Sequence, residues 1–311
     1  VSRHCHNASR ANHGIKPRQN LFTIFLSQND AFHDTKTLTA YISLSYSKLQ
    51  KLQTITASAQ FMTTRIVVLA AGKGVRMNSE IPKVLIPLAG KPLLVHLMDA
   101  IRRSGIDPRP AIVVGENQPL IEAALGKDAY QFIRQDTPLG TGHAVACTEQ
   151  YLAPDADTMI VLYGDHPFVD AETIKKLHAL HTEKGCAITM MTVAVDDFDD
   201  WRKPFYDFGR IVRDENGEIK KIVEVKDATL EERDIKELNP SFFCFRASWL
   251  WPRLKMLKND NVKGEYYLTD LIQLAISEGE CIASIGISPL QSIGINTQEH
   301  LSIAKRLTEQ Q

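Results

Sequence analysis

The stretch Ile66-Val-Val-Leu-Ala-Ala-Gly-Lys-Gly-Val-Arg-Met77 joins a short apolar run to a glycine-rich loop. Gly72 and Gly74 let the backbone approach an anion closely, so that successive N–H groups can face it. Three cationic side chains lie in or just after this loop: Lys73, Arg76 and Lys83. We therefore predict a buried strand followed by a loop that binds a polyphosphate.

This loop differs from two common phosphate-binding motifs. The dinucleotide fingerprint G-x-G-x-x-G needs a third glycine where Met77 stands, and no Gly-Lys-Ser/Thr follows at the spacing of a P-loop. No order of Ser, His and Asp or of Cys and His stands out as a covalent catalytic set. Phosphoryl or nucleotidyl transfer needs chiefly positioning and charge neutralisation, which cations and Mg²⁺ supply.

The composition excludes several classes of partner. The chain has 311 residues, 44% of them hydrophobic, and a formal net charge of -1, which disfavours binding to nucleic acid. No apolar run approaches the roughly 20 residues that span a bilayer. The five cysteines form no C-x-x-C pair, and their odd number argues against a disulfide framework. We therefore expect a cytoplasmic protein in a reducing compartment.

Residues 1–62 differ in composition from the remainder. They hold seven Lys and Arg against two Asp, whereas the remainder holds 29 basic and 35 acidic residues. The first methionine, Met62, lies just before the first strong strand. We expect Met62 to be the natural start and residues 1–61 to be a disordered, non-native or upstream-translated extension. An organellar transit peptide is the alternative, because the segment is poor in acidic residues and rich in Ser.

From Thr63 onward, short β-branched runs alternate with amphipathic stretches. This alternation predicts an α/β fold with a doubly wound, mixed but mostly parallel sheet. The expected strands are 65–70, 110–115, 130–134, 158–163 and 187–195, and the expected helices are 92–104, 117–126, 141–152 and 171–184.

The pattern changes after about residue 196. Two strand-like segments flank the turn Asp214-Glu-Asn-Gly217 and predict a hairpin, within a smaller β-rich lobe across the site. The later expected elements are strands at 208–213, 218–225 and 281–286, helices at 246–258 and 267–279, and a terminal helix.

A carboxylate follows one of the buried strands. Ligands of open α/β sheets bind outside the carboxyl ends of the strands, and Gly164-Asp165 comes directly after the apolar run that ends at Tyr163. Mg²⁺ prefers hard oxygen ligands and often takes only one or two from the protein, the others coming from water and phosphates. Asp165 is therefore a candidate magnesium ligand. The alternative is that Asp165 caps the helix after Pro167.

A second candidate segment suits a nucleobase. Gln135 follows a predicted strand, and Leu139-Gly-Thr-Gly-His-Ala144 opens the next helix. A glutamine amide can meet a pyrimidine edge with a donor and an acceptor, Gly140 leaves room for a base, and Thr141 offers a hydroxyl. The alternative is a simple turn and helix cap, in which His143 is structural.

Polar residues in the second half can meet the hydroxyl groups of a sugar. They are the loop Gly209-Arg210, the pair Glu224 and Lys226, and Asn239. The alternative is that they are solvated strand ends. The segment from Asp196 to Tyr206, with Trp201, lies before Gly209 like an insertion and can reshape the same pocket.

The residues above resemble those of a known family, the bacterial N-acetylglucosamine-1-phosphate uridyltransferases, over residues 64–308. The motifs that carry the resemblance are, in order, Leu69-Ala-Ala-Gly-Lys-Gly-Val-Arg-Met77 with Pro82-Lys-Val-Leu85, Gln135 with Leu139-Gly-Thr-Gly-His-Ala144, Tyr163-Gly-Asp165, Phe208-Gly-Arg210, Ile222-Val-Glu-Val-Lys-Asp-Ala228, Gly264-Glu-Tyr-Tyr-Leu-Thr-Asp270 and Gly294-Ile-Asn296. One glycine loop alone would be weak evidence, whereas these motifs agree in order and spacing.

The resemblance implies a Rossmann-like nucleotidyltransferase domain over residues 63–311. It implies that UTP and N-acetylglucosamine 1-phosphate react with Mg²⁺ to give pyrophosphate and UDP-N-acetylglucosamine, a cell-wall precursor. The implied roles are nucleotide binding by Leu69, Ala70, Ala71, Gly72, Lys73, Gln135, Gly140, Thr141, Tyr163 and Gly164, catalysis by Arg76 and Lys83, sugar binding by Gly209, Glu224 and Asn239, and Mg²⁺ ligation by Asp165 and Asn296.

The sequence departs from the family pattern in three places. Val75 stands where the glycine loop usually has Thr, which removes a hydroxyl near the phosphates. Asn239-Pro240-Ser241 stands where the family has Asn-Thr/Ser-Gly, so a backbone donor is lost at the sugar site. Many members also carry a left-handed β-helix acetyltransferase after this domain. This chain stops soon after Asn296, so we expect no acetyl-CoA site.

Two other functions stay open at this stage. The same architecture serves other nucleotidyltransferases, with dTTP or CTP as nucleotide and glucose 1-phosphate or another phosphorylated compound as acceptor. The other function is that of a catalytically silent protein that binds nucleotide sugars. A set of five polar and charged residues argues against it, because binding alone does not need all of them: Lys73, Arg76, Lys83, Asp165 and Asn296.

Overall fold

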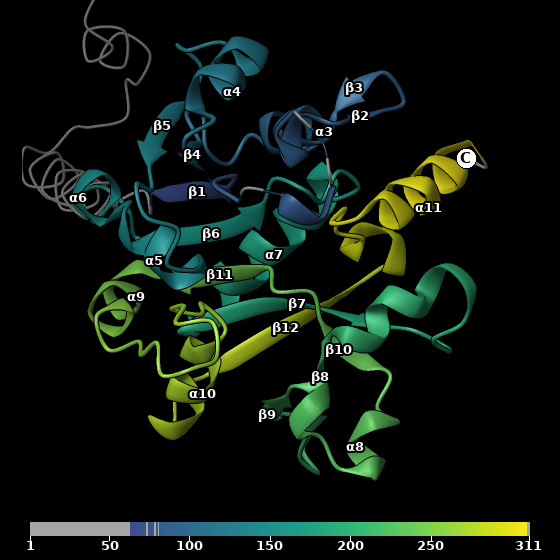
Figure 1. The fold of residues 1–311 in the computed structure, drawn as a ribbon. Coiled ribbons are helices and arrows are strands. Elements are labelled where there is room, and N and C mark those ends of the chain that lie inside the picture. The colour runs from purple at the N-terminus through teal and green to yellow at the C-terminus, as the bar shows by residue number, and fades with distance from the viewer. Residues whose placement is uncertain (1–62, 73, 78, 80, 310–311) are drawn as a thin grey trace, which may run out of the picture. The chain divides into compact units, whose positions relative to one another are not determined.

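The computed structural model describes residues 63–72, 74–77, 79 and 81–309. These residues form a mixed, mostly parallel β-sheet with helices on both faces, which confirms the predicted fold class (Figure 1). The strand order is β5-β4-β1-β6-β11-β7-β10-β8-β9, and β12 pairs with β7. The predicted start at Met62, the extension before it and Lys73 lie outside the described residues.

The nucleotide half of the sheet is parallel and centres on β1 (Thr64–Leu69). β4 (Ala111–Val114) and β6 (Thr158–Tyr163) pair with β1 on either side, and β5 (Gln131–Arg134) pairs with β4. β1, β4 and β6 are rich in Val and Ile because both of their faces are covered, whereas the edge strand β5 is only partly buried. Side chains alternate between faces along a strand, so Val67 packs into one core while Ile66 and Val68 pack into another.

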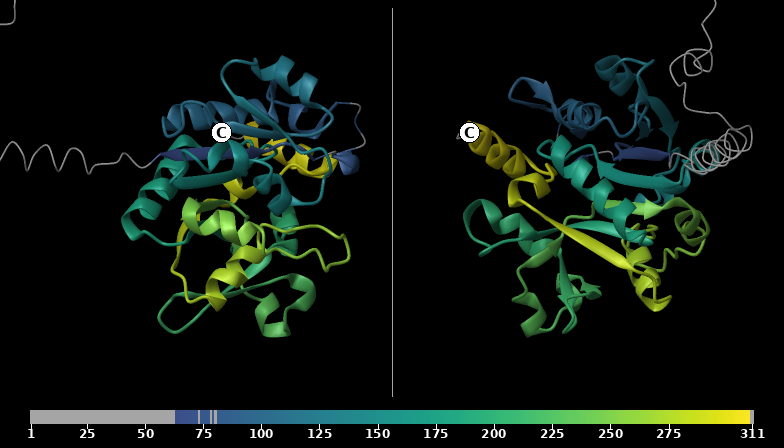
Figure 2. Two further views of the ribbon diagram at one scale, coloured as in Figure 1. Left: turned by 90° about the vertical axis from the view of Figure 1, so that its left-hand side faces the viewer. Right: turned by 180° about the vertical axis from the view of Figure 1, so that it is seen from behind.

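Helices cover both faces of this sheet (Figure 2). One core receives side chains from α3 (Leu93–Ser104), α4 (Gln118–Leu125) and α7 (Ala171–Lys184), and the other from α5 (Thr141–Ala146), α6 (Glu149–Leu152), α9 (Ala247–Leu254) and α10 (Asp270–Ser277). The expected single helix at 141–152 is two helices. Thr148 lies between them, and its hydroxyl donates a 2.7 Å hydrogen bond to the carbonyl of Val145, a local bond that competes with helix continuation.

Strand β7 (Ile188–Ala194) connects the two halves of the sheet. β12 (Ile282–Ile287) pairs parallel with β7 along its whole length. On the opposite edge of β7, two short strands pair antiparallel with successive parts of it. β11 (Phe243–Arg246) pairs with the first part of β7, and β10 (Glu237–Asn239) pairs with the last part. The sequence did not predict β10 or β11, which have three and four residues.

Pro240 and Ser241 interrupt what would otherwise be one strand along this edge of β7. Proline cannot donate to a strand ladder, which fits an interruption. Ser241 has a φ of 68°, in the left-handed region that favours glycine. The pairing resumes where the N–H of Met191 donates to the carbonyl of Phe242 at 3.0 Å.

The predicted hairpin is confirmed as β8 (Gly209–Arg213) and β9 (Ile219–Val223). Its turn closes through the N–H of Asp214, which donates to the carbonyl of Glu218 at 2.9 Å. Because β10 pairs with both β8 and β7, the β-rich lobe is an extension of the main sheet.

A third core lies beneath the segment that sequence analysis described as insertion-like. This segment forms the 3-10 helix η3 (Asp200–Asp207), and its Phe205 packs in a cluster with Leu301 of α11 (Gln298–Glu309). The remaining elements are β2 (Pro87–Leu88), β3 (Lys91–Pro92), α8 (Leu230–Arg233), and the 3-10 helices η1 (Val75–Met77), η2 (Lys83–Leu85), η4 (Val225–Asp227) and η5 (Pro289–Ser292).

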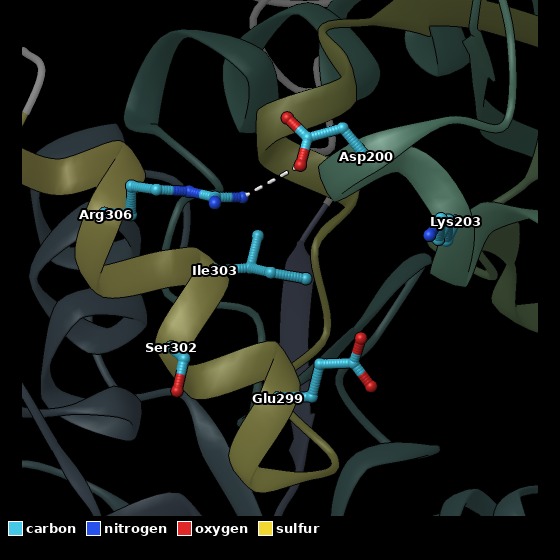
Figure 3. Close-up of a pocket in the computed structure, with 6 residues that line it drawn as sticks. All are labelled: Asp200, Lys203, Glu299, Ser302, Ile303 and Arg306. Atoms are coloured by element: carbon cyan, nitrogen blue, oxygen red, sulfur yellow. Dashed lines mark hydrogen bonds and ion pairs between the residues drawn. The ribbon is translucent and has the colours of Figure 1, made fainter.

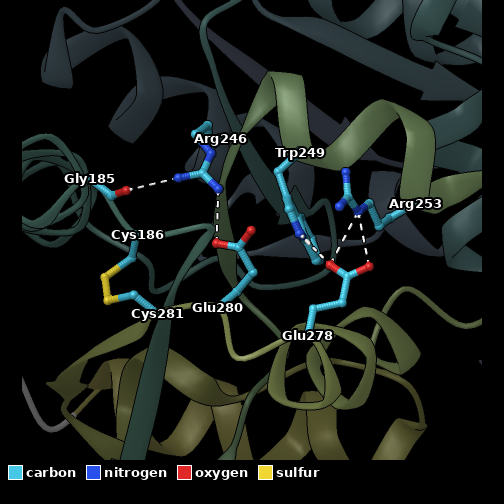
Figure 4. A network of polar contacts seen from close by, with 8 residues as sticks. All are labelled: Gly185, Cys186, Arg246, Trp249, Arg253, Glu278, Glu280 and Cys281. Carbon is cyan, nitrogen blue, oxygen red and sulfur yellow. Dashed lines mark hydrogen bonds and ion pairs between the residues drawn. A yellow bond between two sulfur atoms is a disulfide. The ribbon is translucent and has the colours of Figure 1, made fainter.

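A disulfide joins Cys186 and Cys281, which corrects the expectation drawn from the cysteine count (Figure 4). The two residues precede the neighbouring strands β7 and β12, so strand pairing brings together positions that lie 95 residues apart in the chain. Beside them, Arg246 donates to Glu280 at 2.9 Å and to the carbonyl of Gly185 at 3.2 Å. Within the part of the chain that the structure describes, no helix has the length and apolar character needed to cross a membrane.

Candidate functional site

A cleft of about 1130 Å³ opens at the carboxyl ends of β1 and β6 and extends to the β8–β9 hairpin. It gathers residues that the chain keeps far apart. The predicted site residues that line it are Leu69, Ala70, Ala71, Gly72, Arg76, Lys83, Gln135, Gly140, Thr141, Tyr163, Asp165, Gly209, Glu224, Asn239 and Asn296. Their convergence is a structural finding, and their individual roles stay predictions.

Two predicted site residues are absent from this lining. Lys73 lies outside the described residues. Gly164 is buried behind the cleft, and a Cβ there would meet the side chains of Leu94 at 3.1 Å and Val84 at 3.2 Å. Packing therefore favours glycine at position 164, and its contact with a nucleotide stays a prediction.

Lys83, Asp165 and Asn296 form the centre of the cleft, which we call the Lys83 centre. The Lys83 Nζ donates to Oδ2 of Asp165 at 2.6 Å and to Oδ1 of Asn296 at 2.8 Å. Asp165 stands just after β6 and Asn296 just before α11. The alternative that Asp165 caps a helix is wrong, because Asp170 caps α7 by accepting from the N–H of Thr173 at 2.7 Å.

His166 supports the carboxylate from the other side. Its Nδ1 lies 3.0 Å from Oδ1 of Asp165, and its ring packs edge-on against Phe242. Burial opposes ionisation of Asp165, but the adjacent Lys83 and His166 outweigh burial and hold the pKa of this carboxyl well below its usual range. Asp165 is therefore an anion at neutral pH.

The glycine-rich loop reaches the cleft directly after β1. The N–H of Ala70 still pairs with the carbonyl of Val113 at 2.8 Å, so the chain leaves the sheet beyond that point. Gly74 has a φ of 63°, and a Cβ at this position would lie only 2.6 Å from the Cβ of Lys83. Arg76 is exposed in the cleft, where its charge is accessible to a ligand.

Gln135 lies at the predicted base site with its amide already engaged. Its Nε2 lies 3.1 Å from the carbonyl oxygen of Gly140 and 3.0 Å from Nδ1 of His143. Gly140 has a φ of 102°, and a Cβ there would meet the backbone oxygen of Tyr266 at 2.6 Å. Glycine at position 140 thus allows this loop to pack closely against the backbone of Tyr266.

The predicted sugar residues lie on the β-rich side of the cleft. Asn239 pairs with Gly209 across β10 and β8, and its Oδ1 accepts from the N–H of Ser241 at 2.8 Å. Burial raises the pKa of Glu224, although Lys226 opposes this shift.

Arg210 does not face the cleft, which corrects the interpretation of Gly209-Arg210 as a sugar-binding pair. The Arg210 side chain is completely buried and donates to the backbone carbonyl of Phe208 at 2.6 Å. Its guanidinium also lies over the ring of Phe198, 5.1 Å from the centroid. Arg210 therefore fastens η3 to the hairpin.

Several cleft residues were missed by sequence analysis. They include His166, Lys258, Lys263, Tyr267 and Asp270. Four of these lie in or beside the loop 255–269, whose motif Gly264-Glu-Tyr-Tyr-Leu-Thr-Asp270 was part of the family resemblance but received no role. The motif was the signal that could have placed this loop at the site.

A second, smaller hollow of about 450 Å³ lies between η3 and α11 (Figure 3). Arg306 and Asp200 bridge it with an ion pair of 3.3 Å, and both side chains are exposed. Charged side chains of both signs line this hollow, and none of the predicted site residues does. The ion pair across it connects η3 to α11.

The comparison with known families accords with this geometry. The model of the MobA-like NTP transferase domain matches residues 66–269. The chain belongs to this family. This NTP transferase therefore carries a nucleotidyltransferase domain, as its glycine loop and cleft indicate.

Curated relatives of this NTP transferase confirm the resemblance seen in its motifs. The bifunctional protein GlmU of Exiguobacterium sibiricum is 40% identical over 78% of this chain and 54% of the relative. The bifunctional protein GlmU of Caldicellulosiruptor saccharolyticus is 36% identical over 77% of this chain and 50% of the relative. The NTP transferase thus spans about half the length of the curated relatives it matches.

Solved structures share the fold of this NTP transferase at low identity. A putative glucose-1-phosphate thymidylyltransferase from Bacillus anthracis, in complex with a sucrose, has a TM-score of 0.64 at 20% identity, covering 78% of this chain and 94% of the other. A UDP-glucose pyrophosphorylase complexed with UDP-glucose has a TM-score of 0.62 at 18% identity, covering 80% and 100%.

Proposed function

We propose that this protein transfers a uridylyl group from UTP to N-acetylglucosamine 1-phosphate and releases pyrophosphate, with Mg²⁺ as cofactor. The observation that carries the proposal is the Lys83 centre, which lies in the same cleft as the predicted base site around Gln135 and the predicted sugar site around Glu224. The similarity to GlmU proteins supports the same reaction.

The donor set of the Lys83 centre fits a magnesium ion. Asp165 and Asn296 each contribute a hard oxygen, and both oxygens already converge on one cationic nitrogen. These two residues would hold the ion, and phosphate and water oxygens would complete its shell. The bound ion would supply charge neutralisation at the phosphates.

The residues of the cleft suit an in-line displacement. An oxygen of the sugar phosphate forms a bond to the α-phosphorus of UTP while the bond to the departing pyrophosphate breaks. Arg76 and Lys83, which line the cleft, would offset the negative charge that accumulates on the leaving group. Holding two anions in reacting geometry itself removes a large part of the barrier.

A different sugar 1-phosphate is the second candidate acceptor, and the chain from Asn239 to Ser241 favours it. Pro240 has no N–H to offer, whereas Ser241 contributes a hydroxyl at the same wall of the cleft. These residues change the donors available to a sugar without touching the Lys83 centre.

The test measures pyrophosphate release with Mg²⁺ present or chelated. UTP is compared with dTTP and CTP, and N-acetylglucosamine 1-phosphate with glucose 1-phosphate. We expect turnover that requires Mg²⁺ and is fastest with UTP and the acetamido sugar. Turnover with another pair would keep the reaction class and change the substrate, while silence with every pair would favour a binding protein.

A further inference from the structure

We propose that His143 is a positioning residue for base recognition, which fixes the Gln135 amide so that its oxygen meets the N3–H of uracil or thymine and rejects cytosine. The inference rests on the proposed function, because it concerns the nucleotide that the same cleft binds. It assigns to His143 a role beyond shaping the turn.

The orientation of the Gln135 amide follows from its neighbours. The carbonyl oxygen of Gly140 can only accept a hydrogen bond, so the group 3.1 Å from it must be the amide nitrogen of Gln135. The second N–H of that nitrogen points to Nδ1 of His143 at 3.0 Å. Both donors of the amide are therefore used within the protein.

The contact also defines the tautomer of His143. To accept from Gln135, Nδ1 must carry a lone pair, so the ring proton lies on Nε2. Nε2 in turn lies 3.9 Å from Sγ of Cys147, one helical turn away. Burial, with Asp136 nearby, raises the pKa of this thiol, so the sulfur stays uncharged at neutral pH. The two contacts of the His143 ring, with Cys147 and with Gln135, are thus both satisfied by the same tautomer.

This arrangement leaves the Gln135 Oε1 to face the ligand. Gln135 lines the cleft while only 6% of its surface is exposed. Uracil and thymine present an N–H at position 3, which Oε1 can accept. In the same pose cytosine presents a lone pair at N3, and two acceptors repel each other. The fixed amide is therefore a selector for bases with N3–H.

The frame that carries His143 does not depend on this contact. We call residues 139–142 the base loop. Tyr266 pairs with it through both of its backbone groups, because its N–H donates to the carbonyl of Leu139 at 2.7 Å and its carbonyl accepts from the N–H of Gly142 at 2.8 Å. The hydroxyl of Thr141 accepts from the N–H of Leu268 at 3.0 Å. Replacing the imidazole should therefore change the orientation of the amide without unfolding the loop.

The experiment compares His143→Leu with His143→Asn by equilibrium binding and turnover of UTP, dTTP and CTP. Leucine removes the acceptor, whereas the Oδ1 of asparagine can take the place of Nδ1. We expect His143→Leu to lower the UTP-to-CTP ratio of kcat/KM by about 10-fold, mainly through KM, with dTTP following UTP. His143→Asn should keep the ratio within about 3-fold of the unmodified protein.

The possible failures are distinguishable. An unmodified protein that binds no pyrimidine nucleotide would overturn the proposed function and this inference together. An unmodified protein that discriminates, paired with a His143→Leu variant that discriminates equally, would overturn only the inference. If the leucine variant does not fold, the ¹⁵N shifts of the His143 ring in the unmodified protein decide the matter. A protonated Nε2 with Nδ1 accepting supports the inference, and a protonated Nδ1 refutes it.

Discussion

At the scale of single residues, the Lys83 side chain ties together positions that are 82 and 213 residues away in the chain. Its ammonium group neutralises Asp165, whose burial would otherwise penalise the carboxylate. No local sequence pattern could show this contact, because it depends on three separate segments meeting at one edge of the sheet.

Arg76 provides the sharpest test of a catalytic role. Its side chain is exposed in the cleft, so Arg76→Ala should leave the melting temperature unchanged while kcat falls by about 100-fold or more. Pyrophosphate release and a thermal melt check both parts. Arg103→Ala, an exposed charge on α3 away from the cleft, is the matched control and should stay active. A fully active Arg76→Ala variant would refute the assigned role.

Glu224 should link stability to pH. Burial raises its folded-state pKa, so the stability it contributes is present at low pH and is lost as the pH rises through that pKa. Glutamine has no charge to bury. We therefore expect Glu224→Gln to melt at a higher temperature than the unmodified protein at pH 7 and at a similar temperature near pH 4.

The control for this prediction is Glu231→Gln. A backbone hydrogen bond and the Thr229 hydroxyl lower the pKa of exposed Glu231, so its carboxylate favours the folded state. This variant should gain no stability at pH 7. A Glu224→Gln variant that melts no higher than the unmodified protein at pH 7 would contradict the prediction.

At the scale of elements, the base loop is defined by how closely it packs against Tyr266. Gly140→Ala should lower the free energy of unfolding by about 1–3 kcal/mol more than Gly126→Ala, because only at position 140 would the new Cβ meet backbone atoms. Gly126 is a good control, since its φ of 85° and ψ of 147° lie near the 102° and 178° of Gly140.

The same pair of variants should separate in nucleotide binding. We expect the KM for UTP to rise in Gly140→Ala and to stay unchanged in Gly126→Ala. Equal losses of stability in the two variants, measured by urea titration, would show that strain in φ rather than contact with Tyr266 governs position 140.

Elements with a clear apolar pattern in the sequence were predictable, whereas β10 and β11 were not. The β-branched runs predicted the parallel strands to within a residue or two, and β1, β4, β6 and β7 among them are buried on both faces. β10 and β11 have three and four residues, and they exist because β7 offers an edge to pair with. The inward direction of Arg210 could have been predicted, because neighbours along a strand face opposite sides and Gly209 faces the cleft.

At the scale of the whole molecule, the disulfide links the beginnings of two paired strands. Bridging Cys186 and Cys281 restricts the unfolded chain over a separation of 95 residues. We expect reduction to lower the free energy of unfolding by about 2–5 kcal/mol, measured by urea titration. A Cys186→Ser, Cys281→Ser double variant should show the lower stability without reductant and no further change with it. A reductant-insensitive unmodified protein would argue against the bond.

The candidate site was predictable to the extent that it is made of strand ends. Fifteen of the residues assigned from the sequence line one cleft. Those that follow β1, β5 and β6 meet there because parallel strands deliver their carboxyl ends to the same edge. The contacts that hold these residues in position were not predictable. His166, Tyr266 and the bridge from His143 to Gln135 act through contacts between segments, which a single sequence does not display.

β7 is paired on both of its edges, with one interruption at Pro240 and Ser241, so the two walls of the cleft belong to one continuous sheet and we expect little hinge rotation between them. We therefore expect entry and exit of ligands to depend on segments outside the sheet, foremost the loop 255–269, which contributes Lys258 and Tyr267 to the cleft. The amide protons of β7 should accordingly exchange with solvent only when the whole domain unfolds, whereas those of this loop should exchange early and slow down when nucleotide binds.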